Sequence, residues 1–124
     1  MTNIIFVMTE RLRKLGHRSY EDYLNNNARW HVFRMSRIAK ACWTCGEFRP
    51  FRLVLHHCSY DRLGEERDDD VVTLCEWCHE RCHQMIRDGK AILLDAHHKL
   101  REELRVRGLR QDQPDLPFEP DKAA

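Results

Sequence analysis

Apolar side chains recur at helical spacing through the first third of the chain. Ser19 stands three positions before the acidic Asp22, a pattern typical of a helix start. Apolar residues then follow at intervals close to one helical turn, at Trp30, Phe33, Ile38 and Ala41. The pattern predicts two short helices, or one broken helix, ending before Cys42.

Two short segments further along the chain favour strands. Phe51–His57 follows Pro50 and is rich in apolar and β-favouring residues, and Val71–Leu74 has the same character. The segment between them, Ser59–Asp70, is polar and contains Gly64, which favours a loop. A β-hairpin with a long connection is therefore expected.

Helical spacing returns after the second strand. Cys75–Arg87 predicts a helix that closes near Gly89, and a further helix ends at Gly108. The apolar stripe of that further helix comprises Leu93, Ala96, Leu100 and Leu104. Residues 109–124 are proline-containing and mostly acidic, and are expected to be a disordered tail. These elements predict one α+β domain at residues 19–108, preceded by an N-terminal extension at residues 1–18.

Chain length and net charge add little to this prediction of one α+β domain. The 124 residues suit one domain, and the formal net charge of +1 does not by itself indicate a nucleic-acid-binding protein. Locally, Arg29–Arg52 holds six basic residues against one acid, whereas Leu53–Gly89 holds nine acids against four arginines. The apolar run Ile4–Met8 is too short for a secretory signal, and no stretch is long and apolar enough to span a membrane. A reducing cytoplasm is expected, where cysteines more often bind metal than form disulfides.

Four cysteines form two closely spaced pairs. Cys42 and Cys45 enclose two residues, as do Cys75 and Cys78, and two such pairs complete a tetrahedral structural zinc site. Paired disulfides are the alternative. The other two cysteines, Cys58 and Cys82, have no close partner in sequence and are expected to be buried apolar side chains; a ligand set that includes Cys82 remains open.

Four histidines flank the second cysteine pair. His79 and His83 are four positions apart on a predicted helix, so their rings share one face. His56 and His57 are neighbours on a strand, so they point to opposite faces and only one readily faces the helical pair. A three-nitrogen metal site with an open coordination position is expected, with the second strand histidine left to accept a proton. The alternative is that some of these histidines only pack or belong to the zinc site.

The combined pattern resembles the HNH nucleases, a family with a small ββα-metal, treble-clef-like core, here with a zinc-binding cysteine frame. The residues that carry the resemblance are Cys42, Cys45, His56, His57, Asp70, Cys75, Cys78, His79 and His83. The sequence from Leu55 to Glu66, including Tyr60 and Gly64, is similar to one common bacterial and phage branch. Weaker likeness reaches upstream to about Ser19. The resemblance implies a hairpin and helix core flanked by N-terminal and C-terminal helices.

The resemblance also implies roles for individual residues. His56, His79 and His83 would bind the catalytic metal, and His57 would be the general base that activates water. The asparagine that braces the loop of the family falls on Asp70, which completes the expected catalytic set. A carboxylate accepts the same hydrogen bonds as the amide but donates none, so the loop must be held differently.

Metal-assisted hydrolysis of DNA phosphodiester bonds is the activity that follows from this resemblance. A three-histidine site favours Mn²⁺, Ni²⁺, Co²⁺ or Zn²⁺ as the single catalytic ion over Mg²⁺, which prefers oxygen ligands. The expected DNA contacts are to the backbone phosphates. The arginines assigned to them are Arg29, Arg34, Arg37, Arg49 and Arg52.

The remaining length holds no recognisable module for reading bases. Any specificity would come from a protein partner, a homo-oligomer or the structure of the DNA. The alternative function is a zinc-stabilised DNA-binding or scaffold domain, weak or inactive as an enzyme, in a phage or recombination assembly. Either function places the protein in the cytoplasm of a bacterial cell or a phage-infected host, away from membranes.

Overall fold

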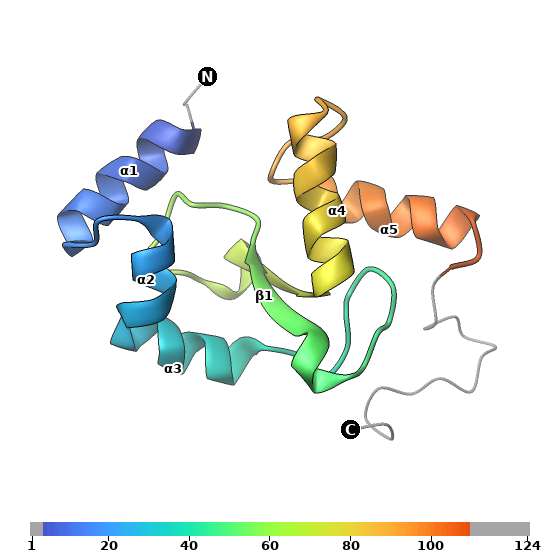
Figure 1. Cartoon of the computed structure of the whole chain (residues 1–124), viewed down its shortest axis with the longest axis horizontal. Helices are drawn as coiled ribbons and strands as arrows, with labels where there is room; N and C mark the ends of the chain where they lie inside the picture. The colour runs from blue at the N-terminus through green and yellow to red at the C-terminus, as the bar shows by residue number, and fades with distance from the viewer. Residues whose placement is uncertain (1–3, 110–124) are drawn as a thin grey trace.

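A computed structural model describes residues 4–109 of the chain, which form helices around one small sheet (Figure 1). Short 3₁₀ turns at Pro50–Arg52 and Asp68–Asp70 lead into the two strands. The helices and strands, in chain order, are α1 (Ile4–Leu15), α2 (Tyr20–Asn26), α3 (Ala28–Arg37), β1 (Leu53–His57), β2 (Val71–Cys75), α4 (Glu76–Arg87) and α5 (Ala96–Val106). The expected α+β class is confirmed.

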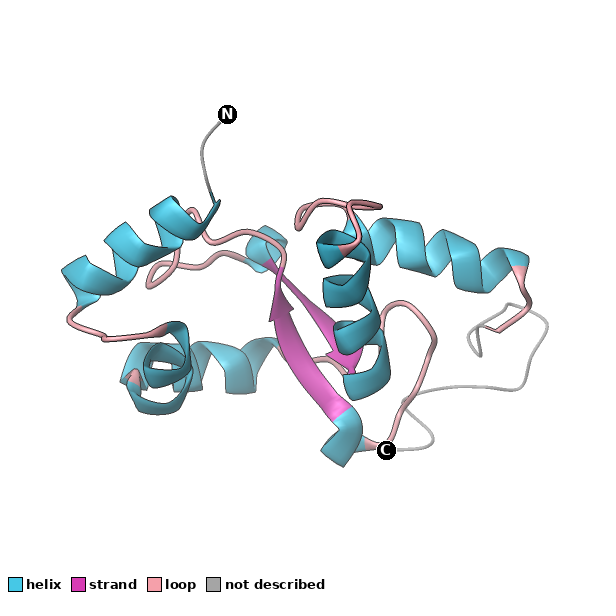
Figure 2. Cartoon of the chain, turned by 45° about the horizontal axis from the view of Figure 1, so that its top comes forward, coloured by secondary structure: helices cyan, strands magenta, loops and turns pink. Residues whose placement is uncertain are grey.

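The hairpin lies between two groups of helices (Figure 2). β1 and β2 pair antiparallel, from Leu53 opposite Cys75 to His57 opposite Val71. One side of the hairpin meets α1–α3 through a core of Leu12, Tyr23, Trp30, Phe33, Leu55 and Leu63. On the other side, α4 and α5 enclose a second core that includes Leu74, Cys82, Met85 and Leu100. Each helix group therefore buries its own apolar face against the hairpin.

The N-terminal helices agree with one of the two predicted alternatives and differ from the prediction only where they end. Asn27 ends α2 and caps α3 by accepting from the Trp30 backbone N–H at 2.8 Å, so there are two helices. The prediction that Ile38 and Ala41 continue the helix was wrong. α3 ends at Arg37, because the chain turns to β2, where the backbone N–H of Ala39 donates to the Thr73 hydroxyl at 2.8 Å.

Residues 4–15 form a helix that the sequence analysis treated only as an extension. Leu12 is buried in the first core, and the Arg11 guanidinium donates to the backbone carbonyl of Leu63 at 2.9 Å. Gly64, at φ +96°, lies close against this helix. A Cβ added at Gly64 would come within 2.8 Å of the Leu15 side chain. α1 is thus fastened to the long loop of the hairpin.

The C-terminal helices follow the prediction more closely. Cys75 caps α4 instead of opening it, and α5 begins at Ala96. Leu93 precedes α5, in a turn that the Asp95 carboxylate closes by accepting from the Ile92 backbone N–H at 3.0 Å. The strand expected from Phe51 begins at Leu53. The predicted tail, residues 109–124, lies outside the described part of the chain except for Leu109. Within residues 4–109, no helix combines the length and the apolar character that crossing a bilayer requires.

The packing of α5 on α4 predicts a stability effect. Leu100 is 0% exposed in the second core, whereas Val106 on the same helix is 70% exposed. Leu100→Ala is expected to lower the free energy of unfolding by about 2–5 kcal/mol, because it leaves a cavity. Val106→Ala is the control and should change it by less than about 0.5 kcal/mol. Urea unfolding followed by circular dichroism measures both, and equal values would contradict the assigned packing.

Candidate functional site

Four cysteines from two separate segments meet at one end of the hairpin. Their sulfur atoms, from Cys42, Cys45, Cys75 and Cys78, all lie within 4.8 Å of one another. Gly46, at φ +87°, closes the first pair by donating its N–H to the Cys42 carbonyl at 2.9 Å. The second pair spans the β2–α4 junction, where the Cys78 backbone N–H contacts the Cys75 sulfur at 3.4 Å. We call these four residues the cysteine group.

The cysteine group is suited to a cation. Hydrogen bonds from Cys45 and Cys75 lower the pKa of Cys42, which favours its thiolate. The hydrogen bond to Cys42 raises the pKa of Cys78, because a second negative charge beside the first is unfavourable without a counterion. Four soft sulfur donors at this separation fit a tetrahedral metal such as zinc. The expected structural metal site therefore has the necessary geometry.

The remaining cysteines lie apart from this group. Cys58 is buried in the hairpin loop, where its thiol donates to the Asp69 carbonyl at 3.3 Å. Cys82 is 0% exposed in the second core and is not among the four mutually close sulfurs. Both occupy the buried positions that the sequence predicted.

Three histidines meet at a second point, formed by β1 and α4. The coordinating atoms of His56, His79 and His83 all lie within 4.8 Å of one another. The Nε2 atoms of His79 and His83 are 3.2 Å apart, and the His56 ring centroid lies 5.1 and 5.3 Å from the other two. We call these residues the histidine group.

Burial keeps the histidine group neutral. Desolvation, with the neighbouring His79 and His83, lowers the pKa of His56 to about 2. Desolvation likewise lowers the pKa of His79 to about 4 and lowers that of His83. Both ring nitrogens of His56 are buried without a hydrogen-bond partner. A neutral imidazole with an unused lone pair is the form that binds a metal, so the residues fit the expected ion.

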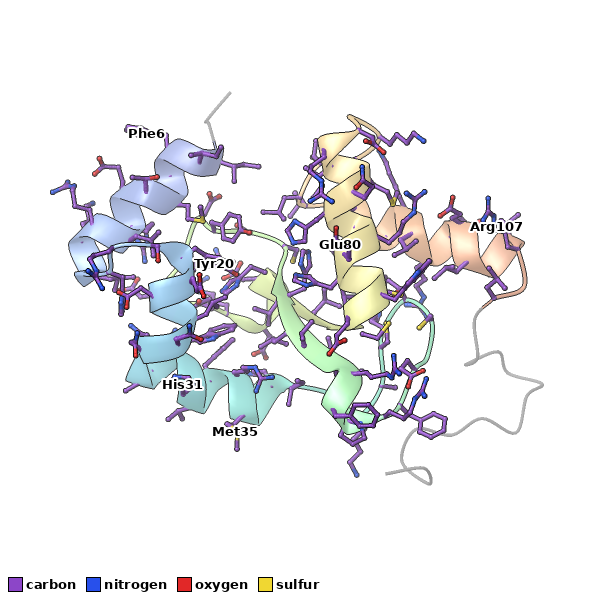
Figure 3. All side chains as sticks on the ribbon, viewed as in Figure 1. Phe6, Tyr20, His31, Met35, Glu80 and Arg107 are labelled. Atoms are coloured by element: carbon purple, nitrogen blue, oxygen red, sulfur yellow. The ribbon has the colours of Figure 1, made fainter. Side chains whose placement is uncertain are left out.

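An open cleft of about 400 Å³ lies beside the histidine group. α2 and α3 form its opposite wall, and the hairpin lies between that wall and α4 (Figure 3, where Tyr20 and His31 are labelled on the first wall and Glu80 on α4). The side chains that line it include Tyr20, Trp30, His31, Arg34, Tyr60 and the three histidines. It thus combines candidate metal ligands with aromatic rings and a cation.

His57 points away from the histidine group and is held by a buried carboxylate. Its Nε2 lies 2.7 Å from Glu66, and both side chains are 0% exposed. Glu66 also accepts from the Tyr23 hydroxyl at 2.7 Å, the Arg29 guanidinium at 2.6 Å and the Gly64 N–H at 3.2 Å. Burial raises the pKa of Glu66, but hydrogen bonds from His57 and Tyr23 outweigh it and lower the pKa to about 2. Glu66 is therefore an ionised anchor.

Tyr20 contacts the other ring nitrogen of His57. Its hydroxyl is 2.6 Å from His57 Nδ1, while the Trp30 ring stacks on the imidazole with centroids 4.5 Å apart. Burial, and then Tyr60, raises the pKa of Tyr20, so its hydroxyl stays protonated. Because ionised Glu66 only accepts, His57 carries its proton on Nε2 and accepts from Tyr20 at Nδ1. The result is a hydrogen-bonded line from the cleft, through Tyr20 and His57, to Glu66.

Asp70 braces the hairpin loop through an arginine. It is buried and accepts from Arg62 Nε at 2.8 Å, Arg62 Nη2 at 2.6 Å and the Arg67 backbone N–H at 2.9 Å. The Cys58 backbone N–H in turn donates to the Asp70 carbonyl at 2.8 Å. Arg62 thus fastens the loop through Asp70 at the position where the resemblance expects asparagine.

Most of the arginines expected at a phosphate backbone contact acidic side chains. The ion pairs are Arg29–Glu66, Arg37–Asp68 and Arg49–Glu47. Arg34 lines the cleft beside the histidine group. Arg52 lies over the exposed Phe51 ring, 5.5 Å from its centroid. Of the five arginines expected to contact the DNA backbone, Arg34 is therefore the one that lines the cleft.

No role is predicted from the sequence for Tyr20, Tyr23 or Glu66. The only signal was that all three lie within the segment that resembles the nuclease family. Nothing in their spacing indicates that α2 reaches the hairpin loop. Comparison with models of protein families, with curated proteins and with solved structures gives no match. Functional conclusions therefore rest on the residues themselves.

The two-group geometry predicts different outcomes for two cysteines, one inside the cysteine group and one outside it. Cys45→Ser is expected to remove one tightly bound zinc ion per chain and to lower the thermal unfolding temperature, because it removes a soft ligand. Cys58→Ser, which lies outside the cysteine group, should retain that ion. Elemental analysis of zinc after dialysis measures this, and equal zinc content in the two variants would contradict the assignment.

Proposed function

We propose that this protein is a metal-dependent endonuclease of the HNH type that hydrolyses DNA phosphodiester bonds. The observation that carries the proposal is the convergence of three neutral histidines on an open cleft, apart from a closed group of four cysteines. A structural metal is fully enclosed by protein ligands, whereas a catalytic metal keeps an open position. The order of β1, β2 and α4 is compatible with the ββα-metal core that the sequence resembles.

His56, His79 and His83 would hold the catalytic ion. Imidazole ligands favour Mn²⁺, Co²⁺, Ni²⁺ or Zn²⁺ over Mg²⁺. When bound, such an ion would polarise the phosphate and stabilise the charge that develops on the leaving oxygen. Arg34 and the aromatic rings of the cleft would position the adjacent nucleotides through phosphate contact and stacking.

Proton transfer would pass through Tyr20. The direct base role that the resemblance implies for His57 requires contact with water, yet its side chain is 0% exposed. The hydroxyl of Tyr20, on the cleft wall, would take the proton of the attacking water as it passes its own proton to His57 Nδ1. Glu66 would then stabilise the imidazolium through Nε2. His57 thus remains the proton acceptor, reached through one intervening hydroxyl.

A second candidate is a zinc-stabilised DNA-binding or scaffold domain without turnover. Burial of His57 between Tyr20 and Glu66 favours it, because the same contacts also serve to fix α2 to the hairpin. This candidate shares the cysteine group but needs neither the histidine group nor Tyr20. DNA binding that persists without cleavage would support it.

Plasmid nicking with each divalent ion separates the two candidates. The native protein is expected to nick supercoiled DNA in the presence of Mn²⁺, Co²⁺, Ni²⁺ or Zn²⁺. His79→Ala is expected to abolish nicking, because it removes a metal ligand, and the control His98→Ala alters an exposed histidine outside the group. Nicking that is absent with every ion, or unchanged in His79→Ala, would refute the nuclease proposal.

The proposed proton route has its own test. Tyr20→Phe keeps the ring and removes the hydroxyl, so single-turnover cleavage is expected to slow by about 10²-fold or more, as is cleavage by His57→Ala. The control is His98→Ala, which changes an exposed side chain outside the cleft. A Tyr20→Phe rate equal to that of His98→Ala would show that the proton leaves by another route.

A further inference from the structure

His97 lies at the start of α5, outside both metal-ligand groups, and is nevertheless buried. It is 6% exposed, and its ring centroid lies 6.3 Å from that of His56. α5 packs on α4, the helix that carries His79 and His83. This arrangement brings a fourth histidine to the edge of the histidine group from an element that contributes none of its ligands.

Three buried ring nitrogens within residues 4–109 have no hydrogen-bond partner, and they lie on these two rings. They are both nitrogens of His56 and Nδ1 of His97. Buried polar atoms are nearly always paired, so three orphans in adjacent side chains require a common explanation. Ring packing alone provides none, because the edge contact of His97 with Trp43 and its tilted contact with His98 leave Nδ1 without a hydrogen-bond partner.

One metal and one hydrogen bond account for all three nitrogens. A neutral imidazole binds a metal through the nitrogen that lacks a proton, so the other nitrogen carries N–H and must donate. Metal-binding histidines usually donate that proton to a nearby acceptor, which fixes the orientation of the ring. The unpartnered His97 Nδ1 is such an acceptor, provided that His97 carries its own proton on Nε2.

We propose that His97 is a positioning residue that accepts the free N–H of His56 through a hydrogen bond relayed by one water, and thereby strengthens metal binding by the histidine group. The proposal rests on the metal site of the proposed function. His97 is not a fourth ligand, since its nitrogens fall outside the set of atoms within 4.8 Å of one another. Its ring is also farther from His56 than the rings of His79 and His83 are, at 6.3 Å against 5.1 and 5.3 Å.

Metal titration of the full chain by calorimetry tests the proposal without DNA. Zn²⁺ and Co²⁺ are added to protein whose cysteine group already holds zinc, so that the titration reports the second site. His97→Leu is expected to weaken that site by about 10–100-fold, because the His56 N–H loses its acceptor. His97→Gln retains an acceptor and should recover most of the affinity. The control His98→Leu, at the exposed neighbouring position, should bind like the native protein.

The outcomes are distinct from those of the nuclease test. Equal affinity of His97→Leu and His98→Leu would overturn the proposal, as would the absence of a second bound ion. A change in the visible Co²⁺ spectrum that shows one ligand lost in His97→Leu would also overturn it, because His97 would then be a ligand. Retention of the first zinc and of native circular dichroism shows that the variant is folded. Weaker binding in a protein that never cleaves DNA would support this proposal while refuting the nuclease.

Discussion

Neighbouring residues of a β-strand point to opposite faces, and in β1 this rule gives His56 and His57 different surroundings. His56 faces α4 and meets two histidines, whereas His57 faces α2 and α3 and meets Tyr20, Trp30 and Glu66. Because the hairpin lies between the two helix groups, both rings are buried. The strand therefore directs one histidine into the group of candidate metal ligands and the other into a hydrogen-bonded network, whose Tyr20 lines the same cleft.

The network around His57 depends on one buried anion. An unpaired carboxylate in this position would be strongly unfavourable, and Glu66 avoids that cost through contacts with His57, Tyr23, Arg29 and Gly64. These partners come from α2, α3, β1 and the hairpin loop, so a single side chain joins four segments. The contacts of Glu66 stabilise the fold and also fix the tautomer of His57. The same residues therefore serve both purposes.

Local patterns in the sequence were sufficient to predict the two groups of candidate metal ligands. The cysteine pairs and the His79–His83 spacing are set by short-range geometry, and the hairpin and α4 were predicted close to their observed bounds. Contacts between distant segments were not predictable in the same way. No local pattern shows that Tyr20 would reach His57, or that Ala39 would bond to Thr73 and end α3. Those contacts depend on how whole elements pack.

Two carboxylates of the hairpin loop, Glu66 and Asp70, are held by both buried and partly exposed contacts. At Glu66 the contact with His57 is fully buried, but the ion pair is with Arg29, whose side chain is 43% exposed, so dissolved salt weakens that pair. At Asp70 the partner is Arg62, whose side chain is 40% exposed, and a pair in that setting weakens as ionic strength rises. Asp70 directly precedes Val71, the register partner of His57. The carboxylate at Asp70 thus makes the brace next to the His57 network depend on a partly solvated charge, whereas the contact of His57 with Glu66 is buried.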